Sequence, residues 1–273
     1  MSDYKDNAMV VQSNKFVRGS YNTFTANEIK CFDLFVSCID VMNPKNTVEI
    51  SKQEFFKALR IEPDYRRFKE ITEGIMTKVW YYIDDEKRIT NNFVQKVIWF
   101  NKEDRIFCKF SDDIMPMLVD LKTNFLQYSF HDLNCFHSKY SMILYKYVLS
   151  YIRQYRILSF YVDLDELRKV LNLTNKYKEF RDFNKKVLIK FVSEINNSMA
   201  LQYLVDYEKC TKGKKVIGVR FKVRPRTANS ETDFNDVKNP IMYEEMCSKM
   251  LKDGANILEI RNRQADMIIN KGK

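Results

Sequence analysis

Glycine, histidine and paired cysteine are scarce in this chain of 273 residues, which has 6 glycines, 2 histidines and 6 cysteines. So few glycines leave little material for a phosphate-binding loop, and none of the patterns GxxxxGKS, GxxxxGKT, GxGxxG and GxSxG occurs. The cysteines stand alone, with no CxxC pair, so neither a zinc module nor a disulfide framework is indicated. We expect reduced, mostly buried thiols.

The residues that catalysis would need are also missing. His131 and His137 are not a His-x-His metal pair, and on a helix their spacing points them away from each other. A rolling-circle nickase would need that pair and a nucleophilic tyrosine. The carboxylates of Asp163, Asp165 and Glu166 fit a helix N-terminus, where the helix dipole favours negative charge. We predict that the chain is not an enzyme and uses no metal and no cofactor.

Long hydrophobic runs are absent, since no stretch approaches the roughly 18 apolar residues of a membrane span. The polar start, MSDYKDN, is no signal peptide. We expect a soluble, cytoplasmic protein without a membrane partner. Positive charge is plentiful instead: 46 Lys and Arg against 36 Asp and Glu give a net charge of +10 and a pI near 9.1. This favours a polyanionic partner, either nucleic acid or an anionic surface.

The most informative stretch is Val162–Ile195. It predicts a short helix over Leu164–Leu171, a turn, and a longer helix from about Tyr177. The longer helix has one apolar face at a period of 3.6 residues, formed by Phe180, Phe183, Val187, Leu188 and Phe191. Lys178, Arg181, Lys185 and Lys186 project from the other side, with Asn184 on the flank. Leu201–Glu208 and Val216–Val223 then read as a β-hairpin around a Lys/Gly turn. Helix, helix and hairpin is the order of a winged helix.

A second copy of the pattern lies upstream. Tyr65–Ile71 (YRRFKEI) matches Tyr177–Phe183 (YKEFRDF), and at the same offset Ile50–Ile61 falls on Val162–Leu173 without gaps. An ungapped register across several predicted helices indicates two diverged copies of one unit. In the first copy we expect a strand at Thr47–Ile50, helices at Ser51–Leu59 and Tyr65–Val79, a strand at Val79–Ile83, and a wing from Phe93–Phe100 and Arg105–Phe110.

Other segments complete the predicted organisation. A helix from Thr25 to about Val41 opens with capping-box spacing, and Asp132–Arg153 predicts a long helix at the start of the second unit. Asp84–Arg88 and Asn91–Asn92 read as breaks between elements. We predict an α+β fold with two tandem winged-helix domains. The predicted division is an N-terminal arm over 1–23, winged-helix domains over 24–121 and 122–225, and a linker with a C-terminal helical tail over 226–273.

Six motifs resemble one known family. They are VVQSN at Val10–Asn14, TANE at Thr25–Glu28, FHSKYSMILYKYV at Phe136–Val148, DLDELRKVLNL at Asp163–Leu173, YKEFRDFNKKVL at Tyr177–Leu188 and EIN at Glu194–Asn196. Together they resemble the replication initiator (Rep) proteins of iteron plasmids over about residues 10 to 225. The motifs from Phe136 to Asn196 are the specific part. The segment after Pro225 lies outside the shared core.

The resemblance implies two winged helices with pseudo-two-fold symmetry. It implies that monomers bind iterons, short direct repeats at a plasmid origin, and that dimers bind an operator and repress their own gene. Possible further partners are the host replication initiator and helicase. The DNA contacts we expect come from the second recognition helix and its approach, from the second wing, and from a less basic first recognition helix. These candidates are Lys176, Tyr177, Lys178, Arg181, Asn184, Lys185, Lys186, Lys212, Lys214, Lys215, Arg66, Arg67 and Lys69.

Within this set, Arg181 and Asn184 are the expected base readers, because arginine suits guanine and asparagine suits adenine. The lysines are expected to contact phosphate. Two other functions fit the sequence. One is a transcriptional regulator that binds DNA in the same way without initiating replication. The other is a non-catalytic scaffold whose basic face binds a protein or an anionic surface.

Overall fold

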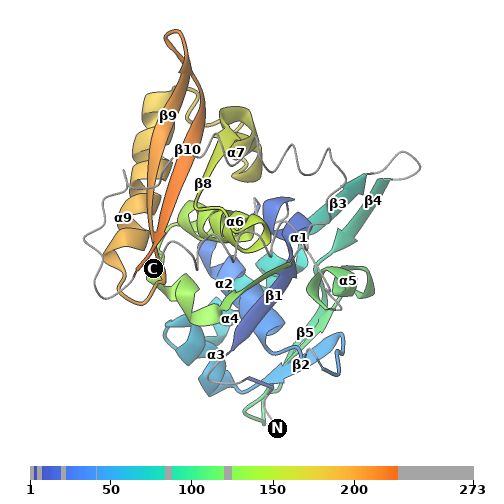
Figure 1. Cartoon of the computed structure of the whole chain (residues 1–273). Helices are drawn as coiled ribbons and strands as arrows, with labels where there is room; N and C mark the ends of the chain where they lie inside the picture. The colour runs from blue at the N-terminus through green and yellow to red at the C-terminus, as the bar shows by residue number, and fades with distance from the viewer. Residues whose placement is uncertain are drawn as a thin grey trace. The chain divides into compact units, whose positions relative to one another are not determined.

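The structure is a computed structural model that describes residues 3–4, 8–19, 23–40, 42–83, 88–119 and 125–226. Apart from Arg226, the predicted C-terminal helical tail lies outside these residues. A first unit runs from a helix through a strand and two further helices to a sheet (Figure 1). Its elements are α2 (Ala26–Ser37), β2 (Thr47–Ile50), α3 (Lys52–Leu59), α4 (Tyr65–Met76), β3 (Val79–Ile83), β4 (Arg88–Asn92), β5 (Val94–Trp99) and β6 (Ile106–Phe110).

A second unit repeats this order. It has a long helix, a strand, a short helix, a recognition helix in three parts and a hairpin. These elements are α6 (Lys139–Tyr155), β8 (Ser159–Asp163), α7 (Leu164–Val170), α8 (Phe180–Phe183), a π-helical turn (Asn184–Leu188), α9 (Ile189–Asn197), β9 (Tyr203–Lys212) and β10 (Lys215–Pro225).

The two units contain sheets of the same topology. The first sheet has the strand order β2-β6-β5 and the second has the order β8-β10-β9, and all neighbours are antiparallel. In each sheet, the strand before the helix pair lies beside the last strand of the hairpin. This is the winged-helix arrangement, and both winged helices predicted from the sequence are present. The first unit also carries a separate two-stranded hairpin, β3–β4.

Local signals explain most helix starts. The Thr25 hydroxyl accepts from the N–H of Glu28 at 3.3 Å, and the Glu28 carboxylate accepts from the N–H of Thr25 at 2.8 Å. This is the predicted capping box, in which two backbone donors are satisfied reciprocally. Ser51 and Glu54 form the same box at the start of α3. The Asp163 carboxylate caps α7 by accepting from two N–H groups of its first turn.

Two predicted elements differ in the structure. The helix predicted over Asp132–Arg153 begins only at Lys139, after a 3-10 turn over Phe130–Cys135. The Asp132 carboxylate accepts from the Tyr145 hydroxyl at 2.6 Å, which folds the turn back onto α6 instead of extending it. The breaks predicted over 84–88 and 91–92 are also wrong in part, because β4 occupies 88–92 as the partner of β3. Cross-strand pairing outweighs the turn preference of its asparagines.

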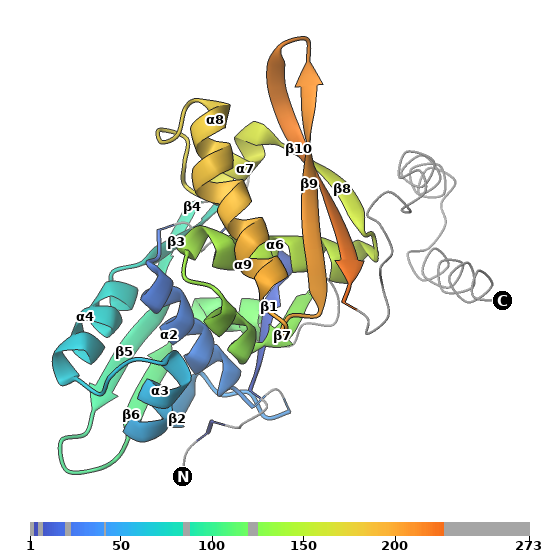
Figure 2. The ribbon, with the colours of Figure 1, turned by 90° about the vertical axis from the view of Figure 1, so that its left-hand side faces the viewer.

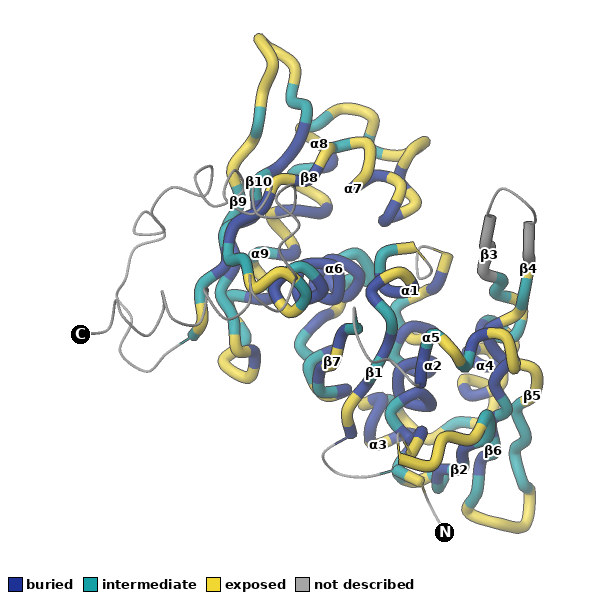
Figure 3. The backbone as a smooth tube through the Cα atoms, turned by 45° about the vertical axis from the view of Figure 1, so that its right-hand side comes forward, coloured by how far each residue is buried: buried dark blue, intermediate teal, exposed yellow. Residues whose placement is uncertain are grey.

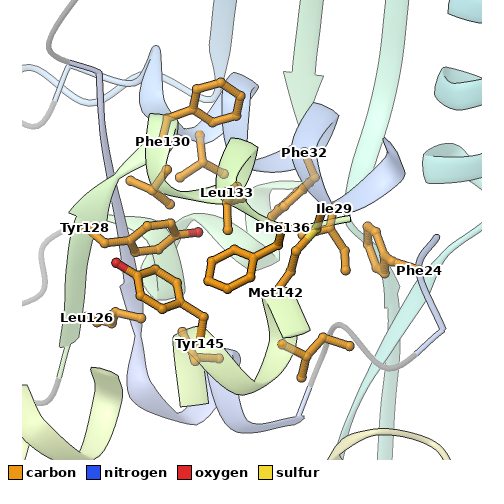
Figure 4. Packing of buried hydrophobic residues seen from close by; sticks show 14 of the residues in the cluster. Phe24, Ile29, Phe32, Leu126, Tyr128, Phe130, Leu133, Phe136, Met142 and Tyr145 are labelled. Atoms are coloured by element: carbon orange, nitrogen blue, oxygen red, sulfur yellow. The ribbon is translucent and has the colours of Figure 1, made fainter. Parts of the chain in front are cut away.

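The segment before the first unit contributes to the core. β1 (Met9–Ser13) pairs with β7 (Phe125–Ser129), and α1 (Asn14–Gly19) packs against α6. The connection between the units also includes a 3-10 turn over Asp112–Ile114 and α5 (Met115–Leu118). Figure 4 shows aromatic side chains gathered here, with Phe130, Phe136, Tyr128 and Tyr145 near Phe32 of α2. The predicted domain boundaries stay a prediction.

A buried ion pair joins the two units. Lys146 of α6 donates to Asp33 of α2 at 2.7 Å, and neither side chain is exposed to solvent. Gln12 of β1 and the hydroxyl of Tyr128 of β7 donate to the same carboxylate at 2.8 and 2.6 Å. Four elements therefore meet at one carboxylate. Burial lowers the pKa of Lys146 to about 8, although the Asp33 charge and hydrogen bond oppose that shift.

Candidate nucleic-acid interface

The recognition helix of the second unit separates an apolar face from a basic one. Arg181, Lys185, Lys186 and Lys190 are exposed. On the opposite side, Phe183, Val187, Leu188, Phe191 and Ile195 are buried in the core. Both faces were predicted from the 3.6-residue period, except that Lys190 was not among the candidates. No carboxylate of the described residues lies within 4.0 Å of these four cations. The face is therefore open to an external anion.

A π-helical turn lies in the middle of this helix. The N–H of Ile189 donates to the carbonyl of Asn184, five residues back instead of four. Such a turn inserts one residue into an α-helix and is frequent at functional sites. Lys185 and Lys186 lie within the turn, so both lysines face solvent while Val187 and Leu188 stay in the core.

The recognition helix begins later than predicted. The sequence pattern placed its start near Tyr177, but α8 starts at Phe180, and Tyr177 has a φ of 49° in the left-handed region. Lys176, Tyr177 and Lys178 therefore lie in the loop that leads into the helix, not on it. A non-glycine residue in this region is strained and needs support from its surroundings.

Arg168 of α7 provides that support. Its guanidinium donates to the carbonyl of Lys178 at 2.8 Å and to that of Lys176 at 3.4 Å, and lies 5.4 Å from the ring of Phe183. The side chain is buried, with 7% of Arg168 exposed. Arg168 was not among the predicted site residues. The signal was a cation on the apolar side of a short helix, between the core residues Leu167 and Val170.

Asn184 is engaged with the wing. Its Oδ1 accepts from the hydroxyl of Tyr207 in β9 at 2.6 Å. Partial burial raises the pKa of Tyr207 above its ordinary value. Bidentate contact with adenine would use the same Oδ1. In this structure Asn184 positions the helix against the hairpin, and its role in reading a base stays a prediction.

A second side chain fastens the far end of the helix. Asn196 donates from Nδ2 to the carbonyl of Val205 and accepts at Oδ1 from its N–H, both at 2.9 Å. Arg226 donates to the carbonyl of Asn196, also at 2.9 Å. With the Asn184–Tyr207 bond, these contacts hold α9 along β9, as Figure 2 shows. Hairpin and recognition helix therefore form one rigid surface.

The wing ends in exposed lysines. Lys212 and Lys215 flank a two-residue turn made of Gly213, which has a φ of 60°, and Lys214. Gly at the first central position suits a type II′ hairpin turn. Figure 3 shows this tip exposed beyond the buried base of the sheet. Lys209 lies nearer the helix, 5.8 Å from the Phe180 ring.

The first unit presents a different surface. Arg66, Arg67 and Lys69 are exposed on α4, as predicted. Arg66 lies 3.7 Å from Asp64, and Lys69 lies 3.7 Å from Glu73 one turn away. Two of the three predicted cations thus already have acidic neighbours. Exposed ion pairs of this kind are weak, so they reduce the local positive charge without locking the side chains.

The described residues include no group of three or more His, Cys, Asp or Glu side chains arranged to hold a metal ion. Within the same residues, no helix has the length and apolar character needed to cross a membrane.

Comparisons with known proteins identify the family. Residues 9–149 match the profile described as initiator replication protein, WH1, and residues 163–223 match that of initiator Rep protein, WH2. The chain belongs to the initiator replication protein family. The predicted resemblance is confirmed, and so is the prediction that the chain is not an enzyme, since the family is one of replication initiators.

Individual relatives agree with this family. A replication initiation protein of Escherichia coli is 25% identical over 214 residues, which are 72% of this chain and 65% of the relative. The chain therefore spans less than two thirds of that relative's length.

Solved structures share the fold. The crystal structure of Pi initiator protein in complex with iteron DNA is similar, with a TM-score of 0.66 and 18% identity over 83% of this chain and 100% of that one. A structure of domains 2 and 3 of RctB has a TM-score of 0.50 and 13% identity, and covers 74% of this chain and 82% of that chain.

Proposed function

We propose that this protein is a plasmid replication initiator that binds iteron repeats at the origin through its second winged helix. The observation that carries the proposal is the open basic face of the recognition helix, held rigidly beside a lysine-tipped wing. Lysines and arginines that form no ion pair within the protein are available to contact phosphate. The fold shared with an initiator crystallised on iteron DNA supports this assignment.

The proposed roles follow from position. Arg181, exposed one residue inside the start of α8, would reach a guanine edge in the major groove. Lys185, Lys186 and Lys190 would contact phosphates along the groove. The wing lysines would contact the backbone beyond it. Lys176 and Lys178, in the loop held by Arg168, would lie at the entry of the helix into DNA.

The first winged helix would bind a neighbouring stretch of the same DNA. Two linked winged helices read major grooves about 10 base pairs apart, so a site near 20 base pairs is expected. We further propose that the two units are related by pseudo-two-fold symmetry. In the cytoplasm, a dimer would bind an operator and repress the protein's own promoter. The host replication initiator and helicase would be further partners.

A nuclease footprint on DNA flanking the gene, with native-gel stoichiometry, tests the proposal. Protection of tandem repeats near 20 base pairs, one monomer each, is the expected result. Protection of a single inverted repeat by a dimer would support a regulator that acts without initiating replication. Absence of any footprint at moderate salt would overturn both and favour a scaffold with a basic face. If six to ten phosphates are contacted, affinity falls roughly 10³–10⁵-fold between 50 and 200 mM salt.

A further inference from the structure

An apolar side chain lies exposed among the cations of the recognition helix. Ile189, the first residue of α9, is 50% exposed, whereas the other large apolar residues of this helix are buried or half-buried. About half of the surface of this branched aliphatic residue therefore stays in contact with water in the free protein. It gains from burial only when a partner covers it.

The π-helical turn puts Ile189 on the exposed face. Its N–H bonds to the carbonyl of Asn184, so Ile189 follows Asn184 and Lys185 by one helical turn. Lys186 and Lys190 are exposed on the same side. Ile189 is therefore an exposed apolar side chain on a stretch of helix whose neighbouring exposed side chains are lysines.

Ile189 also lines one wall of an open groove between helix and wing. The groove has a volume of about 800 Å³, with Ile189, Val192 and Ser193 on the helix side. Its other wall is residues 206–209 of β9. The acidic side chains of that wall are occupied within the hairpin, because Asp206 accepts from the N–H of Tyr207 and Glu208 pairs with Lys222. The groove therefore offers a ligand the aliphatic side chains of Ile189 and Val192, with Lys209 and two carboxylates that already have partners within the hairpin on the other wall.

We propose that Ile189 reads the 5-methyl group of a thymine in the major groove. The methyl is the one apolar feature among the base edges there, and aliphatic side chains contact it. This inference rests on the proposed function, in which the second recognition helix enters DNA. Ile189 would then be a second specificity residue beside Arg181. It would select thymine by apolar contact, whereas Arg181 would select guanine by hydrogen bonds. A protein partner is a poorer fit, since its apolar anchor would have to displace the hydration of the surrounding lysines.

Single thymines replaced by deoxyuridine test the proposal, because that change removes only the methyl. The probe is a duplex carrying the protected repeat, and the full chain is compared with Ile189→Ala. The wild-type protein is expected to lose about four-fold in affinity at one thymine, the equivalent of about 0.8 kcal/mol for a buried methyl. Ile189→Ala is expected to bind thymine and deoxyuridine equally at that position. Ile189→Val should retain part of the discrimination.

Matched controls separate the possible failures. Met42 of the first unit is an exposed apolar residue, with 92% of its surface accessible, and serves as the control. Met42→Ala should lose as much affinity on deoxyuridine substitution as the wild-type protein does. Specific binding by the wild-type protein with no response at any thymine overturns the role of Ile189 alone. A response that survives in Ile189→Ala overturns it too. No preference for the repeat over a scrambled duplex overturns the proposed function together with this inference.

Discussion

The two helix pairs of this protein share a sequence pattern and a fold but differ in the surface they present. In the first unit α4 begins directly at its cap, Asp64, and two of its cations lie beside carboxylates. In the second unit the helix begins after a clamped loop and contains a π-helical turn. Its cations Arg181, Lys185, Lys186 and Lys190 form no ion pair within 4.0 Å among the described residues. A duplicated scaffold has thus kept its packing positions while its two outer faces diverged in charge.

The difference extends to one buried position. Arg168, which holds the loop of the second unit, falls on Phe56 in the ungapped register of the repeat. Phe56 is also buried, but it packs against the ring of Trp99 at 6.2 Å. An apolar contact in one unit corresponds to a hydrogen-bonding cation in the other. The second unit therefore has a loop, at the entry into the recognition helix, whose backbone is held by a buried side chain.

The largest expected effect concerns the buried ion pair between Lys146 and Asp33, which connects the two units. Lys146→Met should lower the free energy of unfolding by about 3–5 kcal/mol, because it leaves the buried Asp33 carboxylate without its cation. Urea denaturation measures it. The double variant Asp33→Asn with Lys146→Met should be less destabilised than Lys146→Met alone. If the single substitution were neutral, the units would be coupled by apolar packing and not by this pair.

Lys146 should also make the free energy of unfolding depend on pH. Its pKa in the folded protein is about 8, below the ordinary value near 10.5, because burial disfavours the charge. Between these two values the unfolded chain binds more protons, so the free energy of unfolding should rise with pH. Unfolding midpoints of the wild-type protein between pH 7.5 and 10, taken relative to the double variant, should show that rise. A fall over this range would contradict the shifted pKa.

Removing the loop clamp should affect the second unit alone. Arg168→Met removes the charged hydrogen bond to the Lys178 carbonyl at 2.8 Å, which is worth about 1.5–3 kcal/mol, together with a longer one to the Lys176 carbonyl at 3.4 Å. Stability should fall by about that amount and repeat binding should weaken. Phe56→Leu is the matched substitution in the first unit, and it should lower stability while leaving binding nearly unchanged. Equal binding losses in both variants would remove the distinction between the units.

What the sequence predicted well has local causes. The capping boxes at Thr25 and Ser51, the apolar period of the recognition helix, and the glycine turn of the wing depend on residues close in the chain. The late start of that helix depends instead on Arg168, which bonds carbonyls eight and ten residues away. The period alone cannot show such a contact, and Tyr177 carries no preference for a left-handed backbone.

The candidate site divides in the same way. The charge pattern of the sequence located the exposed cations, because lysine and arginine side chains are rarely buried and so lie on the solvent-facing side of an amphipathic helix. It did not show that Asn184 is bonded to Tyr207 of a hairpin strand, a partner 23 residues on. The charge pattern also did not single out Ile189, because the exposure of an isoleucine depends on how the helix packs against the core.

Base reading gives the most direct comparison of the two recognition helices. Arg181→Ala should cost about 1–3 kcal/mol of binding free energy and relax the preference at one base pair. Arg66→Ala, with its cation already beside Asp64, should cost less and change no preference. Competition binding with single-base variants of the repeat measures both. A uniform loss across all sequences for Arg181→Ala would place Arg181 on phosphate.

The smallest expected effect is at the tip of the second wing. Lys214 is exposed next to Gly213, so its ammonium can reach a phosphate but is held by no described partner. Lys214→Ala should weaken all sequences evenly and reduce the slope of log affinity against log salt by about 1, because one fewer counterion is released. Lys69→Ala is the control in the first unit, where the cation already neighbours Glu73. A smaller change in slope for Lys69 would locate the stronger phosphate contact in the second unit, and a larger one would reverse that assignment.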